Sequence, residues 1–314
     1  MPERLLACQF PGLNDRHVGM GSDLDTSHPH VRRIYEEASE AADQNMLSLC
    51  QQGPEEKLLE SKFTQVAVLA TSYAYYSIIT EQINLNPQII VGHSLGEYTA
   101  LVAAGSLKFT DAAKLVFKRG ALLDEESARN PSSMVIVVGA DLETVEQICQ
   151  QSSTEEYPCE IANINSQKQI VVAGRNQAIE NVKKIVELLR KNGVKCFDPD
   201  IHVASHCSLE KDVAQELSVD INATHIEDPS VPVISNVTAD YIKTGEEIKR
   251  LLVAQLTNRV LWLDSFIKMT ECGINTFYEF GSSDILTKLT RRNAKDIGRE
   301  DDISASSTKE LLAA

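Results

Sequence analysis

A serine flanked by glycines, between a short apolar run and an alanine-rich segment, restricts the fold of this chain more than any other feature. Residues 88–91 are rich in β-branched side chains and lead directly into Gly92-His-Ser-Leu-Gly96. The apolar run predicts a buried strand, and the residues after Gly96 predict a helix. Glycines on both sides allow a very tight turn, which lifts the Ser94 hydroxyl to the helix N-terminus. The pattern predicts either a nucleophilic Ser94 or a purely structural strand-to-helix turn.

Strand-like and helical patterns alternate along most of the sequence, which predicts an α/β fold with a mostly parallel sheet. Between residues 134 and 197 the order is strand, helix, strand, strand, helix, strand, and this βαββαβ order is that of the ferredoxin-like unit. We therefore expect a small domain at 132–198, inserted into a large α/β domain formed by 1–131 and 199–295. Residues 296–314 are polar and charged, and we expect a flexible tail there.

The charge balance excludes several classes of partner. The 314 residues include 30 Lys and Arg against 45 Asp and Glu, a net charge of −15 that repels nucleic acids and anionic membrane surfaces. No apolar run approaches the roughly 18 residues of a membrane span, so we expect a cytoplasmic protein. The seven cysteines are scattered without a C-x-x-C pair, which favours reduced thiols and no metal. We also expect a monomer.

A nucleophilic serine needs a base, and His206 is the best candidate by position. It lies between a strand-like segment and a helical pattern, in the kind of strand-end loop where α/β enzymes carry their chemistry. His93 is a poor choice because neighbours across a sharp turn diverge, and His28 and His30 occupy a polar loop. The alternative is that His206 is a loop histidine bonded to the backbone.

Arg119 lies on the apolar stripe of a helix predicted at residues 110–126. A guanidinium turned toward a core costs several kcal/mol unless an anion meets it, and no acid on its own helix face can do so. Its partner is either a structural acid from elsewhere in the fold or a carboxylate ligand, which would match the planar fork. One helix and one loop separate Arg119 from Ser94, so both can reach one pocket. The stripe consists of Ala112, Leu115, Val116, Leu122 and Leu123.

Six segments of the chain, taken in order, resemble the malonyl-CoA:acyl-carrier-protein transacylases of fatty-acid and polyketide synthesis. The resemblance runs from about residue 5 to 292 and implies a hydrolase-like α/β domain that carries a ferredoxin-like insertion. The segments are Phe10-Pro-Gly12 with Val18-Gly-Met20, Gly92-His-Ser-Leu-Gly-Glu97, Lys118-Arg-Gly120, Ser205-His-Cys207, Val233-Ile-Ser-Asn-Val237, and Glu279-Phe-Gly281 with Leu286-Thr287.

The resemblance implies that Ser94 is the acylated nucleophile, His206 its base and Arg119 the residue that holds the free carboxylate of the malonyl group. It further implies transfer from malonyl-CoA to the phosphopantetheine thiol of an acyl carrier protein, with no cofactor and no metal. Leu95 is the type more often seen with malonyl than with methylmalonyl. An acyl hydrolase of the same fold, a methylmalonyl-specific transferase and a binding protein with a decayed site are the alternatives.

The first loop departs from the family pattern. The family usually has F-P-G-Q-G-S-Q, where this chain has Phe10-Pro-Gly-Leu-Asn-Asp-Arg16. The resemblance implies that the backbone N–H groups of Leu13 and Leu95 form the oxyanion hole, and Leu13 keeps that N–H. It also implies that a backbone carbonyl, which we place at Leu261, orients His206 instead of the Asp of the usual triad.

Carrier proteins of this kind are generally acidic, so we expect docking on a local basic patch near the cleft. The alternative for each candidate is an ordinary solvated helix face. The candidates are Lys183, Lys184, Arg190, Lys191 and Lys195 in the small domain, and separately Arg291, Arg292 and Lys295.

Overall fold

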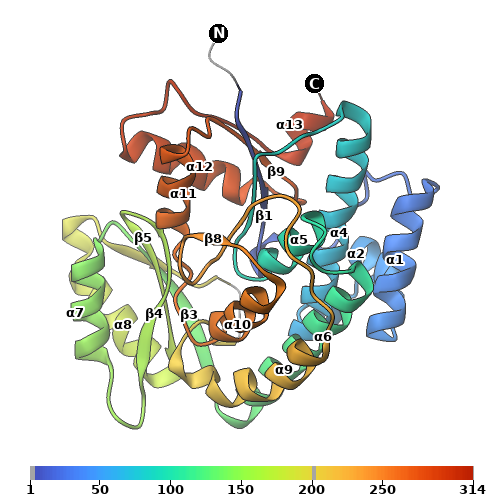
Figure 1. The fold of residues 1–314 in the computed structure, drawn as a ribbon. Helices are drawn as coiled ribbons and strands as arrows, with labels where there is room; N and C mark the ends of the chain where they lie inside the picture. The colour runs from blue at the N-terminus through green and yellow to red at the C-terminus, as the bar shows by residue number, and fades with distance from the viewer. Residues whose placement is uncertain (1–3, 200–202, 314) are drawn as a thin grey trace.

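Two sheets of different kinds organise the protein (Figure 1). The computed structural model describes residues 4–199 and 203–313, so the expected domain limits at residues 1 and 314 and the segment 200–202 lie outside the described residues. The larger sheet has the strand order β10-β9-β1-β2-β7-β8; all neighbours are parallel except β7 and β8. Its strands are β1 (Leu6–Phe10), β2 (Ile89–Gly92), β7 (Val233–Ile234), β8 (Tyr241–Ile242), β9 (Thr276–Glu279) and β10 (Ser304–Ser306).

Helices cover both faces of the parallel sheet, as an apolar sheet of this kind requires. Along β1 and β2, alternate side chains enter different clusters: Cys8, Phe10 and Ile90 belong to one, and Ala7 and Val91 to the other. The first cluster includes α1 (Pro29–Ala42), α2 (Met46–Gln52), α3 (Glu55–Leu58), α4 (Ser61–Ile83), α5 (Gly96–Ala103), α6 (Phe109–Arg129), α9 (Lys211–Ala223) and α10 (Gly245–Gln255). The second includes α11 (Trp262–Glu271) and α12 (Ile285–Asp296).

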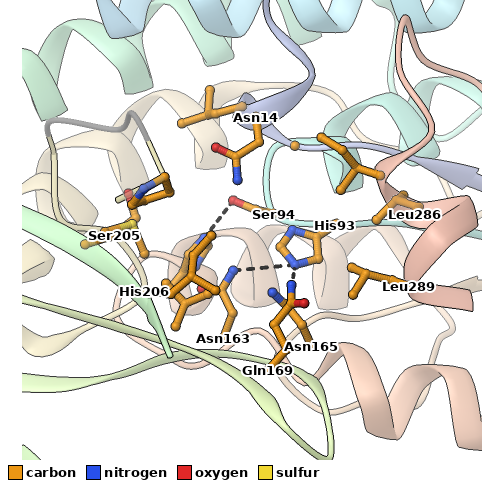
Figure 2. Close-up of a pocket in the computed structure, with 17 residues that line it drawn as sticks. Asn14, His93, Ser94, Asn163, Asn165, Gln169, Ser205, His206, Leu286 and Leu289 are labelled. Atoms are coloured by element: carbon orange, nitrogen blue, oxygen red, sulfur yellow. Dashed lines mark hydrogen bonds between the residues drawn. The ribbon is translucent and has the colours of Figure 1, made fainter. Parts of the chain in front are cut away.

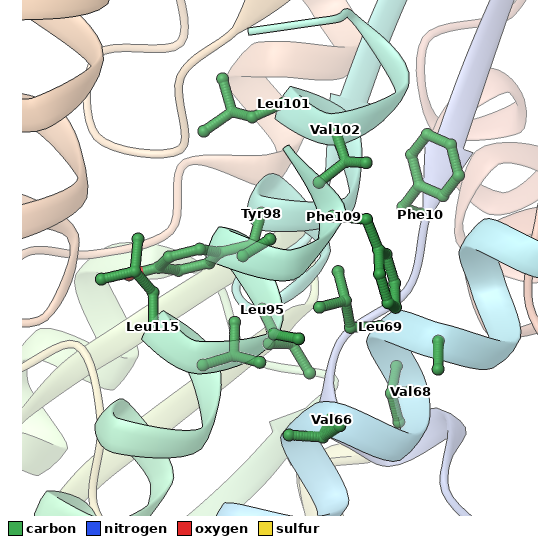
Figure 3. Packing of buried hydrophobic residues seen from close by; sticks show 14 of the residues in the cluster. Phe10, Val66, Val68, Leu69, Leu95, Tyr98, Leu101, Val102, Phe109 and Leu115 are labelled. Atoms are coloured by element: carbon green, nitrogen blue, oxygen red, sulfur yellow. The ribbon is translucent and has the colours of Figure 1, made fainter. Parts of the chain in front are cut away.

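The helix after Ser94 is enclosed by this first cluster. Leu95, Tyr98 and Leu101 are fully buried, and they pack with Leu69 of α4 and Leu115 of α6 (Figure 3). The 23-residue helix α4 is buried along much of its length, because its middle turns are apolar on all sides. The turn that carries Ser94 therefore leads into a fully buried helix, which fixes the position of the serine.

The second sheet is antiparallel, with strand order β4-β5-β3-β6. Helices α7 and α8 cover one face of it, where they pack on Val135 and Val137 of β3, while Met134 and Ile136 point to the opposite face. The strands are β3 (Ser132–Val138), β4 (Cys159–Ser166), β5 (Gln169–Arg175) and β6 (Lys195–Phe197), and the helices α7 (Leu142–Ser152) and α8 (Asn176–Leu188). The mixed architecture confirms the predicted α/β fold class.

The expectation of a flexible C-terminal tail is wrong for the described residues to 313. Strand β10 pairs with β9 as an edge strand of the large sheet. Helix α13 (Thr308–Leu312) begins with a capping box between Ser307 and Glu310. The Thr308 hydroxyl donates to the Glu279 carbonyl at 3.0 Å and accepts from the Gly281 N–H at 2.9 Å. Polar side chains anchor this segment, which is why its composition suggested disorder.

No helix among the described residues combines the length and the apolar character that crossing a membrane requires.

Candidate active site

Two close backbone approaches form the turn that carries Ser94. A Cβ atom on Gly92 would lie 1.9 Å from the Gly96 carbonyl carbon, and one on Gly96 would lie 2.1 Å from the Phe10 carbonyl oxygen. Only glycine fits at either position. Ser94 itself has a φ of 54°, in the left-handed region that non-glycine residues rarely occupy. Such strain persists only where the surroundings fix it, and it is common at functional sites.

Ser94 and His206, from segments more than a hundred residues apart, meet in a cleft (Figure 2). The Ser94 Oγ lies 2.6 Å from the His206 Nε2. On the other side of the ring, the His206 Nδ1 lies 2.7 Å from the backbone carbonyl oxygen of Gln255. A carbonyl can only accept, so the Nδ1 carries the proton and the Nε2 is free to accept one from the serine. The structure thus brings together the serine and the histidine that the sequence singled out.

Burial and, to a smaller extent, the nearby positive charge of Arg119 lower the pKa of His206 to about 3. The Gln255 carbonyl opposes this change, because it stabilises the protonated ring. His206 is therefore neutral near pH 7, which is the form that can take up a proton.

The carbonyl that faces His206 belongs to Gln255, so the placement at Leu261 is wrong. Gln255 is the last residue of α10, and the final carbonyls of a helix have no partner within it. That of Gln255 is therefore free to accept from the ring. The Leu261 carbonyl is engaged at the start of α11, where it accepts from the Ser265 N–H at 3.0 Å and the Ser265 hydroxyl at 2.8 Å.

Three buried polar residues without a predicted role, Asn236, Gln255 and Glu97, form hydrogen bonds around the turn that carries Ser94. The Asn236 Oδ1 accepts from the Ser94 N–H at 2.6 Å, and its Nδ2 donates to the Gly92 carbonyl at 2.6 Å. The Gln255 Nε2 donates to the Ser94 carbonyl at 3.0 Å and to the Glu97 carboxylate. Burial raises the pKa of Glu97 to about 7. Asn236 and Glu97 both lie within the family-like segments, which was the only signal for them.

Arg119 is completely buried and has no acidic partner at ion-pair distance among the described residues. One terminal nitrogen donates to the neutral Gln65 Oε1 at 2.8 Å, while the Nε and the other terminal nitrogen have no hydrogen-bond partner. Burial lowers its pKa, opposed by Tyr98, Glu210 and Glu97 at longer range. The structural ion pair that the sequence left open is thus not formed here, and two donors remain for an anion.

The cleft lies between the antiparallel sheet and the elements around the large sheet, and it encloses about 250 Å³. Its walls are mostly apolar, and polar groups gather around Ser94, as in many small-molecule sites. The antiparallel sheet contributes Met134, Ile136, Asn163, Asn165, Gln169 and Val171, and the rest of the lining is Gly12, Leu13, Asn14, His93, Ser94, Pro199, Ser205, His206, Ile285, Leu286 and Leu289. Arg119 is not exposed in this cleft.

Two backbone N–H groups near Ser94 are unpaired within the part of the chain that the structure describes. Leu95 is the N-cap residue of α5, and Leu13 begins the short 3-10 helix η1 (Leu13–Asp15) at the cleft wall. Neither amide donates to a described acceptor. An unpaired amide at a helix N-terminus also lies at the positive end of the helix dipole. The two donors suit a developing negative charge.

The remaining histidines near the site or in the polar loop are engaged elsewhere. The His93 Nε2 lies 2.8 Å from the Asn165 Oδ1, so its ring turns away from Ser94 (Figure 2). His28 is the N-cap of α1, where its Nδ1 accepts from the His30 N–H at 3.4 Å. His30 is exposed. Of the histidines that the structure describes, His206 alone is bonded to Ser94.

The strained serine, its neutral histidine and two free amide donors are the parts of an acyl-transfer site. The acyl transferase domain family matches residues 10–308, and the chain belongs to this family. The malonyl CoA-acyl carrier protein transacylase of Haemophilus influenzae is 37% identical over 293 residues, 93% of this chain and 93% of that protein. The protein of the same name from Bacillus subtilis strain 168 is 35% identical over 288 residues, 91% of this chain and 90% of its own length.

Solved structures of two malonyl transacylases are similar to this chain over almost its whole length. A malonyl-transacylase in complex with its type II polyketide acyl-carrier protein is 33% identical, with a TM-score of 0.90 over 99% of this chain and 98% of that one. The malonyl CoA-acyl carrier protein transacylase from Coxiella burnetii is 32% identical, with a TM-score of 0.90 over 99% and 96% of the two chains. These relatives confirm the family resemblance inferred from the sequence.

Proposed function

We propose that this acyltransferase moves a malonyl group from CoA to the phosphopantetheine thiol of an acyl carrier protein, through a malonyl-Ser94 intermediate. Arg119 supports malonyl as the acyl group, because this buried cation lies near His206 and has two unpaired hydrogen-bond donors. A malonyl group brings a free carboxylate to meet them, whereas an uncharged acyl chain would leave the guanidinium unpaired.

In the first half-reaction, the His206 Nε2 takes the Ser94 proton while the Oγ attacks the thioester carbonyl. The Leu13 and Leu95 N–H groups hold the tetrahedral oxyanion. Collapse expels the CoA thiolate, which takes the proton from His206. The Gln255 carbonyl, 2.7 Å from the Nδ1, stabilises the transient imidazolium, in the position that an Asp holds in the usual triad.

In the second half-reaction, the carrier-protein thiol gives its proton to His206 and attacks the acyl-serine, and Ser94 leaves as its hydroxyl. These steps use residues of the chain alone, and we propose that no metal or cofactor takes part. Malonyl-CoA and the carrier protein are the two partners that the chemistry requires.

Arg119 connects substrate binding with the base. Its charge contributes to the low pKa of His206. A malonyl carboxylate on Arg119 neutralises that charge, so a bound malonyl group makes His206 a stronger base than an acetyl group does.

The test is the acyl-enzyme itself. Ser94→Ala should form no adduct when mixed with malonyl-CoA and examined by intact-mass analysis, while the parent protein forms one. His93→Ala is the matched control on the same turn, and it should still acylate, since its ring bonds Asn165 rather than Ser94. A persisting adduct in Ser94→Ala would remove the nucleophile from this role.

The nearest alternative is a hydrolase of the same fold, in which water takes the acyl group. Labelled malonyl-CoA, tested with and without carrier protein, separates transfer from hydrolysis. Transfer gives labelled carrier protein. Hydrolysis gives free malonate at a rate that does not depend on the carrier protein. We further propose a preference for malonyl over methylmalonyl, which comparable kcat/KM values for the two would contradict.

A further inference from the structure

The departure of the first loop from its family pattern coincides with a buried hydrogen-bond cluster. Asp15, at the end of η1, is 1% exposed and has no Lys or Arg at ion-pair distance among the described residues. Its Oδ2 accepts from the Ser282 N–H at 2.7 Å and from the Ser282 hydroxyl at 2.9 Å. Its Oδ1 accepts from the Ser283 N–H at 2.8 Å and from the Ser283 hydroxyl. The acid is thus paired with four neutral donors.

These bonds join two walls of the cleft. Ser282 and Ser283 come just before Asp284, the N-cap of α12, and the first residues of that helix, Ile285 and Leu286, line the cleft. The Ser282 hydroxyl shares its one proton between the Asp15 side chain and the Asp15 backbone carbonyl, 2.8 Å away, so the end of η1 is held through both its side chain and its backbone.

The other end of η1 rests on the nucleophile turn. A Cβ atom on Gly12 would lie 2.9 Å from the His93 carbonyl oxygen and 3.6 Å from the Ser94 Cβ. Leu13 and Asn14 therefore lie between two fixed points, the turn at Gly12 and the Asp15 cluster. Asn14 extends its amide over Ser94 (Figure 2).

We propose that Asp15 is a positioning residue for acyl transfer: by tying η1 to Ser282 and Ser283 it holds the Leu13 N–H at the oxyanion position beside Ser94. The proposal rests on the proposed function for its substrate. Oxyanion donors act only when preorganised, because a donor that must move during the reaction loses much of its effect. The substituted loop is then a rebuilt part of the site, and Asp15 supplies the rigidity that its new sequence needs.

The test compares Asp15→Asn with a control of similar structural cost. Asn keeps one acceptor oxygen but turns an NH₂ donor toward the remaining serine donors, so η1 loosens. Thr308→Val is the control, because it removes two buried hydrogen bonds of the same segment, with the Glu279 carbonyl and the Gly281 N–H, and none of the bonds to Asp15. Both variants should lower the urea midpoint. The double variant Ser282→Ala/Ser283→Ala is milder, because it keeps both backbone donors to Asp15. It replaces Asp15→Asn as the test variant if Asp15→Asn does not fold.

We expect Asp15→Asn to slow single-turnover acylation by saturating malonyl-CoA about 10- to 100-fold, somewhat less than the loss of a complete oxyanion donor. The KM for malonyl-CoA and the apparent pKa of the rate should not change, because Asp15 contacts neither Arg119 nor His206. The double serine variant should show a smaller loss, and Thr308→Val none. Parental acylation by folded Asp15→Asn, or equal slowing by Thr308→Val, would overturn the proposal.

A fluorophosphonate gives a readout that does not depend on the proposed substrate. His206 takes the Ser94 proton, the Oγ bonds to phosphorus and fluoride leaves, while the phosphoryl oxygen accepts from the same two amides. Asp15→Asn should slow this labelling by a similar factor. If the parent protein failed to acylate with malonyl-CoA but kept the Asp15 effect on labelling, the proposed substrate would fall and the role of Asp15 would stand. An unchanged labelling rate would overturn the role itself.

Discussion

At the scale of single residues, the site places two buried ionisable groups of opposite sign near the Ser94–His206 pair without joining them. Glu97 is bonded to Gln255 and the Asn236 N–H, and Arg119 to the neutral Gln65. Had the two formed an ion pair, the guanidinium would be satisfied and of no use to an anionic substrate. Keeping them apart leaves Glu97 bonded to Gln255 and Asn236, and leaves two Arg119 donors free for the carboxylate role that we propose for this residue.

Arg119→Ala tests this division. Removal of a desolvated, charge-assisted pair should cost malonyl transfer about 2 to 5 kcal/mol in kcat/KM. Acetyl transfer should not fall, since acetyl has no carboxylate to pair with Arg119 and the loss of the Arg119 charge raises the pKa of His206. The measurement is kcat/KM for malonyl-CoA and acetyl-CoA with one carrier protein, and Lys118→Ala, on the exposed side of the same helix, is the control. Equal loss with both substrates would contradict the carboxylate role.

At the scale of elements, a buried acid in the segment after His206 lies close to charged side chains of α6 and β5. Glu210 ends the 3-10 helix η3 (Ser208–Glu210) and is 2% exposed. Glu126 of α6 lies near it, as do the cations Arg119 of α6 and Arg175 of β5. Burial, and then the charge of Glu126, raise the pKa of Glu210 to about 8, and the two arginines only partly oppose them. Ionisation of Glu210 at this position is therefore unfavourable near neutral pH.

The predicted consequence is a pH-dependent stability. A folded pKa above the ordinary 4.5 means that the contribution of Glu210 is fully present below pH 4.5 and is lost as the pH rises toward about 8. The loss is at most about 1.4 kcal/mol per pH unit for one proton. Glu210→Gln should match the parent near pH 5 and be the more stable by pH 8 in urea unfolding, while the other buried acids affect both proteins equally. A difference that does not vary with pH would contradict the shift.

The sequence predicts those features of the fold and the site that neighbouring residues determine, and it misses those that depend on contacts between distant segments. The elbow at Ser94, the strand-end His206 and the apolar stripe around Arg119 are local patterns, and the structure brings the first two into direct contact. Gln255 was missed because what matters is the free carbonyl at the end of α10, a backbone property that no side-chain pattern reports. The C-terminal strand was missed since β10 is a short polar edge strand that depends on pairing with β9.

At the scale of the whole molecule, the net charge of −15 makes docking of an acidic carrier protein depend on where the few accessible cations lie. Of the two candidate patches, the one on α12 is nearer the chemistry. Arg292 lies 2.6 Å from the Oε1 of Gln169, and Gln169 and Leu289 both line the cleft. Helix α8 covers the face of the small sheet that points away from the cleft, and its Lys183 is already paired with Asp198.

Charge reversal should distinguish the two patches. Arg292→Glu should raise the KM for carrier protein about fivefold, the effect of roughly 1 kcal/mol at an exposed charge, and leave the KM for malonyl-CoA unchanged. Lys184→Glu makes the same charge change on α8 and should alter neither value. The difference in carrier-protein KM between Arg292→Glu and the parent should shrink as salt is added, because salt screens the attraction between exposed charges. A larger effect of Lys184→Glu would place docking on α8 instead. An equal rise of both KM values in Arg292→Glu would mean that this substitution disturbs the cleft through Gln169 and does not report on carrier-protein docking.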